Sequence, residues 1–296
     1  MPAPLSPFTP FQVALLAWAA DLGRDLPWRR TRDPWAVLVS ELMLQQTQVV
    51  RVVPRYRAFL GRFPTPAACA AAPVGEVVRA WAGLGYNRRA VHLHAASTVL
   101  VERFGGRLPA TLDELRSLPG VGPYTARAVL AFAHEADVGV LDTNAARVLA
   151  RVAGRRLAPG EAQALAGSVV PPGTGWSWNQ AVLDLGATVC TRRRPRCGDC
   201  PLPAAGACAW ALAGHVGVDP ADGSAGVGRP QSAFAGSDRQ GRGRLVDALR
   251  VGPVAEASLA VACGWPDDPD KAQRVAAGLV ADGLAGYADD GRLRLP

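Results

Sequence analysis

Residues Leu118-Pro119-Gly120-Val121-Gly122-Pro123-Tyr124-Thr125 decide how this chain of 296 residues is interpreted. The string lies between two segments with helical periodicity, 112–117 and 123–133. Gly120 and Gly122 allow a tight turn and a close approach of the main chain to a ligand. Pro123 suits the first turn of the next helix, whose N–H groups have no intrahelical partner and can face a phosphate. The sequence therefore predicts two helices joined by a hairpin that binds phosphate.

Such a helix–hairpin–helix grips DNA without reading its sequence, and Gly120, Gly122 and Thr125 are its candidate contacts. An ordinary turn between two helices is the alternative. The charge distribution favours DNA: the chain has a net charge of +7, of which residues 1–210 carry +9 and residues 211–296 carry −2. The first 210 residues are therefore expected to bind an anionic partner, and the remainder is not.

Amphipathic, alanine-rich helices dominate those 210 residues, and almost no alternating strand pattern occurs in them. Thr9-Pro10 and Asp33-Pro34 are typical helix starts, and Gly83, Gly105 and Gly154 are typical C-terminal caps. The predicted fold class is all-α. The remaining helices are expected at 10–22, 34–46, 49–63, 74–82, 88–104, 143–152, 160–169 and 178–188.

The last third of the chain has a different pattern. Residues 213–236 are rich in Gly, Asp, Ser and Pro and are predicted to form a linker. Residues 237–296 contain helical patterns at 239–249, 254–263 and 270–282, then two short strands near 286–288 and 292–295. Three helices and a terminal hairpin resemble a small winged-helix module. Such modules often bind DNA, but the negative local charge argues against strong phosphate contact here.

Membrane and secretory segments are not expected. No apolar run approaches the roughly 18 residues that a membrane span needs. Met1-Pro2-Ala3-Pro4 does not begin a charged segment followed by an apolar one, as a signal peptide would. We expect a monomer in the cytoplasm, associated with the nucleoid, with no membrane partner.

Two carboxylates are candidate catalytic groups. Asp142 directly precedes a predicted helix, where Asp is a common N-cap. Capping does not exclude catalysis, because backbone N–H donors keep a carboxylate ionised and fixed, as stabilisation of a sugar cation requires. Glu41 lies among Val37, Leu38, Leu42 and Leu44. Apolar surroundings would help it keep a proton and act as a general acid, whereas a polar helix face is the alternative.

Four of the six cysteines crowd into 19 positions: Cys190, Cys197, Cys200 and Cys208. Clustered thiolates in a chain of this kind more often bind metal than form disulfides, and they suit a tetrahedral zinc ion or an iron–sulfur cube. Cys69 and Cys263 stand alone in helical stretches and are expected to be buried as small hydrophobes. The first cysteine interval contains Arg192, Arg193, Arg194 and Arg196, which suit a phosphate clamp, with a solvated turn as the alternative.

Taken together, these strings resemble the helix-hairpin-helix DNA glycosylases of the endonuclease III superfamily over about residues 8–210. Within that superfamily the chain resembles the MutY-type adenine branch. The branch assignment rests on Leu26-Pro27-Trp28-Arg29, residues 40–48, Gly83-Leu84-Gly85-Tyr86, Gly122-Pro123-Tyr124-Thr125, and Asp142 with Asn144. The resemblance implies one helical domain from 8–27 and 136–212, which carries the cysteines, and a second, 28–135, which carries the hairpin.

The resemblance also implies the chemistry. An adenine opposite 8-oxoguanine or guanine in double-stranded DNA is flipped into a pocket and its N-glycosidic bond is hydrolysed. Glu41 would protonate adenine N7, and Asp142 would stabilise the oxocarbenium-like sugar with support from Tyr124 and Asn144. Gln46 and Tyr86 would fill the gap opposite the orphaned base. The four clustered cysteines would hold a [4Fe–4S] cluster that shapes the arginine loop.

Tyr124 stands where the bifunctional branch of the superfamily has a Schiff-base lysine, and Lys271 is the single lysine in the chain. The resemblance therefore implies a hydrolytic enzyme with little strand cleavage. Two alternatives stay open: a thymine–guanine mismatch glycosylase of the same fold, and a non-catalytic DNA-binding protein. The chain departs from the family pattern in its last cysteine interval, in Asn87, and in a tail too short for the Nudix-like domain that recognises 8-oxoguanine.

Overall fold

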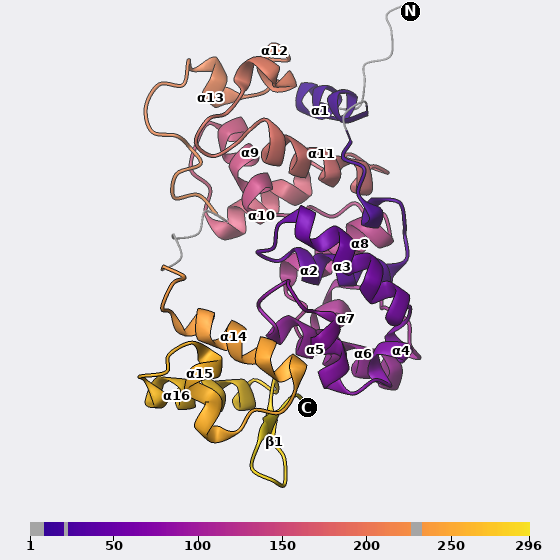
Figure 1. Ribbon diagram of the computed structural model, residues 1–296. Coiled ribbons are helices and arrows are strands. Elements are labelled where there is room, and N and C mark those ends of the chain that lie inside the picture. Colours follow the sequence, from indigo (N-terminus) through magenta and orange to yellow (C-terminus); the bar gives the residue numbers. More distant parts are fainter. Residues whose placement is uncertain (1–8, 21–22, 226–232) are drawn as a thin grey trace, which may run out of the picture. The chain divides into compact units, whose positions relative to one another are not determined.

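The computed structural model describes residues 9–20, 23–225 and 233–296 and divides the chain into two compact units. Unit 1 comprises residues 1–34 and 122–230, and unit 2 comprises 35–121 and 231–296. Both units are helical, which confirms the predicted all-α class (Figure 1). No helix in the described part of the chain is long and apolar enough to span a bilayer.

Unit 1 is built around α9 (Thr143–Ala153) and α11 (Gly175–Thr188), with α1 (Pro10–Ala20) packed against α11. Phe11 of α1 meets Trp178 of α11 edge to face, with ring centroids 5.0 Å apart, and Leu15 and Leu185 are fully buried in the same core. The elements of unit 1 are α1 (Pro10–Ala20), a short 3-10 helix η1 (Pro27–Arg29), α8 (Pro123–Ala133), α9 (Thr143–Ala153), α10 (Pro159–Ser168), α11 (Gly175–Thr188), η2 (Cys197–Asp199), α12 (Pro201–Ala204) and α13 (Ala209–Leu212).

Unit 2 has its core between α3, α5 and α6, where Phe59 packs on Trp81 at 5.9 Å and an interplanar angle of 88°. Its first elements are α2 (Pro34–Leu44), α3 (Val49–Arg62), α4 (Pro66–Ala70), α5 (Val74–Ala80), α6 (Arg88–Phe104) and α7 (Leu112–Arg116). Its last elements are α14 (Asp238–Val251), η3 (Glu256–Ser258), α15 (Leu259–Cys263), α16 (Pro269–Ala281), β1 (Gly286–Tyr287) and β2 (Leu293–Arg294).

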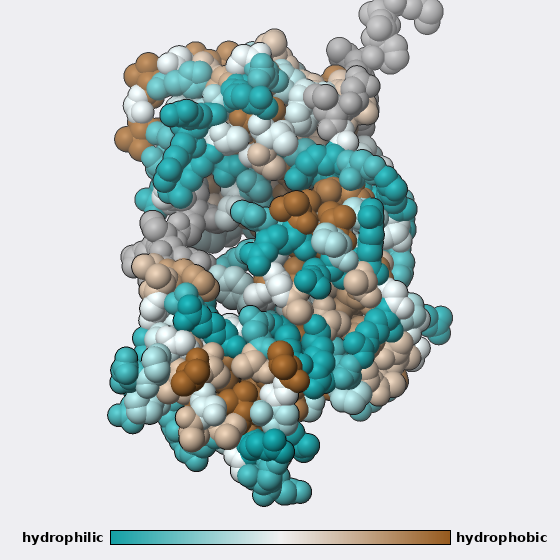
Figure 2. Space-filling view, in the orientation of Figure 1, coloured by the Kyte–Doolittle hydropathy of each residue, from teal (hydrophilic) through white to brown (hydrophobic). Residues whose placement is uncertain are grey.

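These last elements form the predicted three helices and antiparallel hairpin, which we call the C-terminal module (residues 233–296). In the hairpin Gly286 pairs with Arg294 and Tyr287 with Leu293. The module packs against α5 and α6 of its own unit rather than standing apart. Arg250 donates to the Val78 carbonyl at 3.1 Å and to Asn87 Oδ1 at 2.8 Å. On the face shown in Figure 2, hydrophobic residues stand out singly over the module among polar ones.

The unit boundaries at 34/35 and 121/122 differ from the expected 27/28 and 135/136, because α8 packs with α11 and so belongs to unit 1. The expected linker 213–236 also differs in its first part. Asp219 pairs with the buried Arg151, and the Ala225 N–H donates to the Leu157 carbonyl at 3.0 Å. These bonds attach residues 219–225 to unit 1. Residues 21–22, the expected end of the first helix, and 226–232 lie outside the described residues.

Candidate active site and DNA-binding surfaces

The glycine turn before α8 has the local conformation that the sequence predicts. Gly120 has a φ of +76°, and a Cβ there would lie 2.6 Å from the Cβ of His92. Gly122 is exposed and extended, and it precedes Pro123 at the start of α8. Thr125, a predicted DNA contact, is only 2% exposed. Its part in phosphate binding would therefore come from its main-chain N–H in the first turn of α8, not from its hydroxyl.

Glu41 is buried in unit 2. Glu41 is 5% exposed, and its neighbours on α2, Val37, Leu38 and Leu42, are 2% exposed or less. The helix starts at Pro34 and turns nearly its whole circumference into the core, so that Glu41 has no polar face to occupy. The polar-face alternative is therefore wrong, and the burial expected of a general acid is present.

Asp142 caps α9 in unit 1. Its Oδ1 accepts hydrogen bonds from the main-chain N–H groups of Asn144 at 2.8 Å and Ala145 at 2.7 Å. Its Oδ2 accepts a third from the Asn144 side-chain amide at 2.9 Å. The carboxylate is therefore fixed in place, as predicted. Burial nevertheless raises the pKa of Asp142 above its ordinary value, and the three hydrogen bonds only oppose that rise.

Arg147, which the sequence did not reveal, ties this carboxylate to the cysteine loop. It donates to Asn144 Oδ1 at 2.8 Å, to the Gly186 carbonyl at 2.6 Å and to the Cys190 carbonyl at 2.7 Å. Position 186 must be glycine, since a Cβ would lie 2.7 Å from that of Asn144. Asn144 is thus held from both sides. Tyr124, half-buried near the start of α8, completes the predicted catalytic residues of unit 1.

Gln46 and Tyr86 both adopt left-handed backbone conformations, with φ of 53° and 44°. Non-glycine residues at such angles carry strain that the surrounding structure must hold, and they concentrate at functional sites. Tyr86 is 42% exposed. Nothing in the local sequence marks either turn as left-handed, because neither residue is Gly, Asn or Asp.

Arg89 holds these two turns together, a role that nothing in the local sequence indicates. Its guanidinium is buried and donates to seven acceptors, six of them main-chain carbonyls. The acceptors are the carbonyls of Leu42, Met43, Gln45, Leu84, Gly85 and Tyr86 and the hydroxyl of Thr47. Burial lowers the pKa of Arg89 to about 10, so it stays charged at neutral pH. A planar, always charged group with five donors suits this position better than lysine would.

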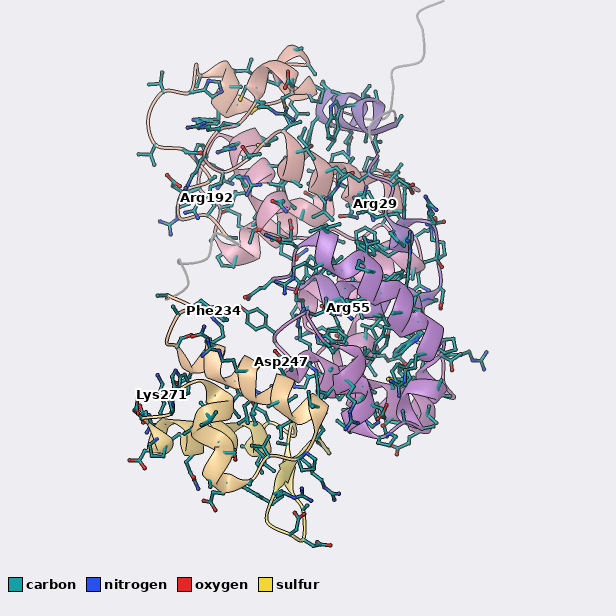
Figure 3. All side chains as sticks on the ribbon, in the orientation of Figure 1. Arg29, Arg55, Arg192, Phe234, Asp247 and Lys271 are labelled. Atoms are coloured by element: carbon teal, nitrogen blue, oxygen red, sulfur yellow. The ribbon has the colours of Figure 1, made fainter. Side chains whose placement is uncertain are left out.

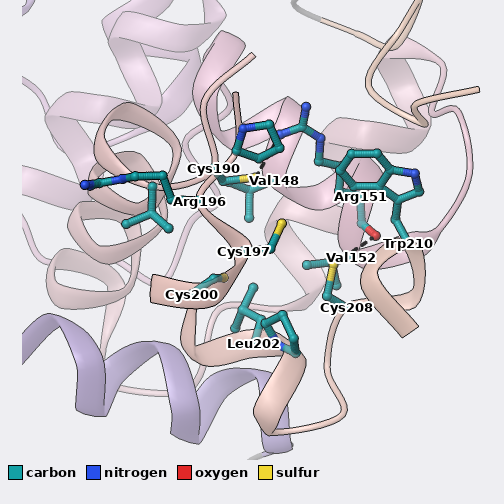
Figure 4. Close-up of a pocket in the computed structure, with 13 residues that line it drawn as sticks. Val148, Arg151, Val152, Cys190, Arg196, Cys197, Cys200, Leu202, Cys208 and Trp210 are labelled. Carbon is teal, nitrogen blue, oxygen red and sulfur yellow. Dashed lines mark hydrogen bonds between the residues drawn. The ribbon is translucent and has the colours of Figure 1, made fainter. Parts of the chain in front are cut away.

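The four clustered cysteines line one small pocket in unit 1, together with Arg151 and Trp210 (Figure 4). Arg151 donates to Cys190 Sγ at 3.3 Å and to the Thr191 carbonyl at 2.9 Å. All four cysteines are free thiols. Burial raises the pKa of Cys197, Cys208 and Cys200, in the last case to about 11. Among the described residues, no three Cys, His, Asp or Glu side chains converge on the position of one metal ion.

The seven-residue interval before Cys208 is accommodated by α12. Leu202 of that helical turn is 2% exposed, and its carbonyl accepts the Ala207 N–H at 2.8 Å after the chain reverses at Gly206. Cys69 and Cys263 are fully buried, as predicted for small hydrophobes.

The arginine loop between Cys190 and Cys197 is at the surface of unit 1. Arg192, Arg193 and Arg194 are exposed, and Thr191 closes the turn by donating to the Arg194 carbonyl at 2.7 Å. Arg196 is exposed but donates to the Thr188 carbonyl at 2.8 Å, so it also holds the loop against α11. The arrangement presents three cations on a short, pinned turn, which fits a contact with DNA phosphates.

Comparisons with known proteins show which family the chain is similar to. Residues 39–172 match the family described as HhH-GPD superfamily base excision DNA repair protein. The chain is 45% identical over 290 residues to an adenine DNA glycosylase of Mycolicibacterium smegmatis, covering 96% of this chain and 95% of that one. It is 42% identical over 205 residues to a thymine/uracil-DNA glycosylase of Pyrobaculum aerophilum, covering 66% and 89%.

The solved structure of a thermostable thymine-DNA glycosylase matches with a TM-score of 0.65 at 29% identity, over 69% of this chain and 95% of that chain. The Mycolicibacterium smegmatis alignment leaves only 4% of this chain uncovered, so it includes most of the C-terminal module. That module is therefore shared with a relative named as an adenine DNA glycosylase.

Proposed function

This chain belongs to the adenine DNA glycosylases of the HhH-GPD superfamily of base excision DNA repair proteins, and from that premise we propose which residues act and on which mismatch. The reaction of the family is hydrolysis of the N-glycosyl bond of adenine. We propose that this chain acts on double-stranded DNA in which adenine is opposite 8-oxoguanine or guanine. The observation that most directly supports hydrolysis of a glycosidic bond is the fixed carboxylate of Asp142.

Asp142 stabilises the cationic sugar that develops as the glycosidic bond breaks. Its three hydrogen bonds hold it in one position, so little reorganisation is needed during the reaction. Because burial disfavours its negative charge, the carboxylate gains more from a developing cation than an exposed one would. Tyr124 and Asn144 support this site, Asn144 through its bond to Asp142.

Glu41 supplies the proton. A buried carboxyl group keeps its proton more readily than an exposed one, so it is suited to protonate the leaving adenine at N7 and afterwards to help activate water. Two carboxyl groups with these separate roles follow the general logic of glycosidic-bond hydrolysis. No lysine occupies position 124, so the route through a Schiff base is missing at this site.

The test is single-turnover base release from a panel of duplexes: adenine opposite 8-oxoguanine, adenine opposite guanine, thymine opposite guanine, and matched controls. Glu41→Gln and Asp142→Asn should each reduce adenine release at least about a thousandfold, since each removes a group used in the transition state, while duplex binding is kept. Wild-type rates in both variants would refute these roles. Borohydride trapping should be weak, and any product that survives in Lys271→Ala with a blocked N-terminus would refute a purely hydrolytic reaction.

A thymine–guanine glycosylase is the second candidate, because a thymine/uracil-DNA glycosylase and the structure of a thymine-DNA glycosylase are both similar to this chain. The same panel decides between the two. Thymine release that exceeds adenine release would favour this second function.

We further propose that Cys190, Cys197, Cys200 and Cys208 hold a [4Fe–4S] cluster. A cube places each thiolate on a different iron, so the four sulfur atoms need only surround a common space, as they do in Figure 4. Cationic Arg151 beside Cys190 suits the negative charge of bound thiolates. When bound, the cluster would fix the arginine loop. A broad brown absorbance with bound iron and sulfide is expected, whereas a colourless, zinc-loaded protein would refute it.

A further inference from the structure

Unit 2 contains a cleft that begins at the turns of Gln46 and Tyr86 and extends to the C-terminal module, and we call it the basic cleft. Its volume is about 810 Å³, within the roughly 300–1,000 Å³ typical of ligand sites. One wall comes from residues 45–51 and 84–92, which include the strained turns at Gln46 and Tyr86. The other wall comes from the C-terminal module, through Phe234 and the sides of α14 and α16.

The described residues that line the cleft include five arginines and no acidic residue. Arg51 and Arg88 belong to the first wall, and Arg239 and Arg242 to the second. Asp282, just outside the lining, is the carboxylate that pairs with Arg88, at 3.4 Å, and with Arg242. Two guanidinium groups that share one carboxylate leave this part of the cleft positive.

The charge of the C-terminal module is therefore segregated. Its negative net charge comes largely from exposed acids on the α15–α16 connection, the start of α16 and the tip of the hairpin. These acids are Asp267, Asp268, Asp270, Asp289 and Asp290, and none of them lines the cleft. The net charge argued against phosphate binding by the module as a whole, but the wall that faces the cleft is cationic.

Two exposed aromatic side chains add a second kind of contact. Tyr86 is 42% exposed and Phe234 is 56% exposed. Figure 3 shows Phe234 projecting from the segment before α14 toward the α2–α6 part of its unit. The guanidinium of Arg239 lies 5.4 Å from the Phe234 ring centroid. Cationic walls with exposed aromatic faces are the usual combination for binding a nucleic-acid strand with an unstacked base.

We propose that the basic cleft is a DNA-binding site, in which Arg51, Arg88, Arg239 and Arg242 contact phosphates and Tyr86 and Phe234 contact an unstacked base. The C-terminal module is thus part of the DNA-binding surface. The proposal rests on the proposed function in that DNA is the partner, but it concerns binding and not base release.

The test compares two double variants of the full-length protein. Arg239→Ala/Arg242→Ala removes two cleft arginines, and Arg274→Ala/Arg292→Ala removes two exposed arginines of the same module that do not line the cleft. Both lose the same charge. Anisotropy titrations with a 30-base-pair duplex containing adenine opposite 8-oxoguanine are run from 50 to 300 mM KCl, with a fully matched duplex in parallel.

The cleft variant should bind at least about tenfold more weakly at 150 mM KCl, and its slope of log K against log[salt] should be smaller by about 1 to 2. The control should stay within about twofold. Equal affinities and slopes for both variants would overturn the proposal. Arg239→Lys/Arg242→Lys keeps the charge and should recover most of the salt slope. If this variant has a wild-type melting temperature but does not recover the slope, the loss of affinity comes from packing and not from charge, which would also overturn the proposal.

Phe234→Leu tests the aromatic contact. It should weaken mismatch binding about fivefold or more and leave binding of the matched duplex unchanged, because only the mismatch supplies an unstacked base. An equal effect on both duplexes would refute that contact. Anisotropy reports binding and not base release. The same pattern of affinities, together with no adenine release by the wild-type protein, would therefore refute the proposed function and leave the cleft in place.

Discussion

Replacement of Arg89 by methionine should destabilise unit 2 strongly, because this single side chain satisfies seven acceptors. Methionine keeps the apolar stem and removes every donor. Six main-chain carbonyls around Gln46 and Tyr86 then lose a partner in a position that is 7% exposed. A buried polar group left without a partner costs about 1–3 kcal/mol, but the turns can relax and admit water.

Adding seven such terms would overestimate the effect. Removing one partner of a buried charged network costs about 3–5 kcal/mol in proteins, and we expect a loss in that range. Desolvation of Arg89, visible in its pKa lowered to about 10, already offsets part of what its hydrogen bonds contribute. Unit 2 has roughly 150 residues, and about 2.1 cal/mol/K per residue gives a fall in melting temperature of about 10–15 °C.

The assay is thermal unfolding followed by circular dichroism, with Arg88→Met as the control on the same helix. The side chain of Arg88 is 60% exposed and its ion pair at 3.4 Å is solvated, so its loss should cost less than about 1 kcal/mol. Adenine release measured well below the melting temperature should also fall in Arg89→Met, since Gln46 and Tyr86 lose the group that holds their strained backbones. A melting temperature within 3 °C of wild type would refute the reasoning.

Three further predictions concern other groups. Asp142→Asn should abolish adenine release yet keep or raise the melting temperature at pH 7. Burial raises the pKa of Asp142, so its ionisation destabilises the fold as pH rises through that pKa, and asparagine, which is never charged, still caps a helix. A melting temperature more than 5 °C below that of the wild type would contradict this. Gly120→Ala places a Cβ 2.6 Å from His92 at a φ of +76°, and should lower stability by about 1–3 kcal/mol and weaken duplex binding in anisotropy titrations. Asp219→Asn breaks a pair between the partly exposed Asp219 and the buried Arg151, which keeps other acceptors, and should destabilise unit 1 by about 1–3 kcal/mol at pH 7. Because the pKa of Asp219 is lowered, thermal unfolding at decreasing pH should show this difference vanishing below the ordinary value of 3.8.

Local chemistry explains what the sequence predicted well. Pro34 and Pro123 begin α2 and α8, and Gly105 and Gly154 end α6 and α9 in left-handed conformations. The cap formed by Asp142 and the burial of Glu41 followed from their immediate neighbours in the chain. The short helices α4, α12 and α13 were missed because four or five residues give only a weak periodic signal, although α7, which is equally short, was predicted.

The missed site residues depend on contacts between distant segments. Arg89 serves carbonyls that precede it by more than 40 positions, and Arg147 reaches Gly186 and Cys190 about 40 positions later. A sequence does not show which main-chain carbonyls need a hydrogen-bond donor, so an arginine that binds them cannot be distinguished from a surface arginine. Asp219 was assigned to a linker for the same reason, since its partner Arg151 lies 68 positions earlier.

The use of arginine in place of lysine affects both the structure and the chemistry of this chain. Lys271 is the one lysine among 32 basic residues, and the buried arginines at 89, 147 and 151 each bind several acceptors from separate segments. A guanidinium can do this because its five donors spread in a plane, whereas an ammonium presents three donors at one point. Arginine thus fixes the turns around Gln46, the cap at Asp142 and the cysteine loop, while position 124 stays without an amine nucleophile. The same residue type that supplies the positive charge for DNA also holds the proposed catalytic groups in place.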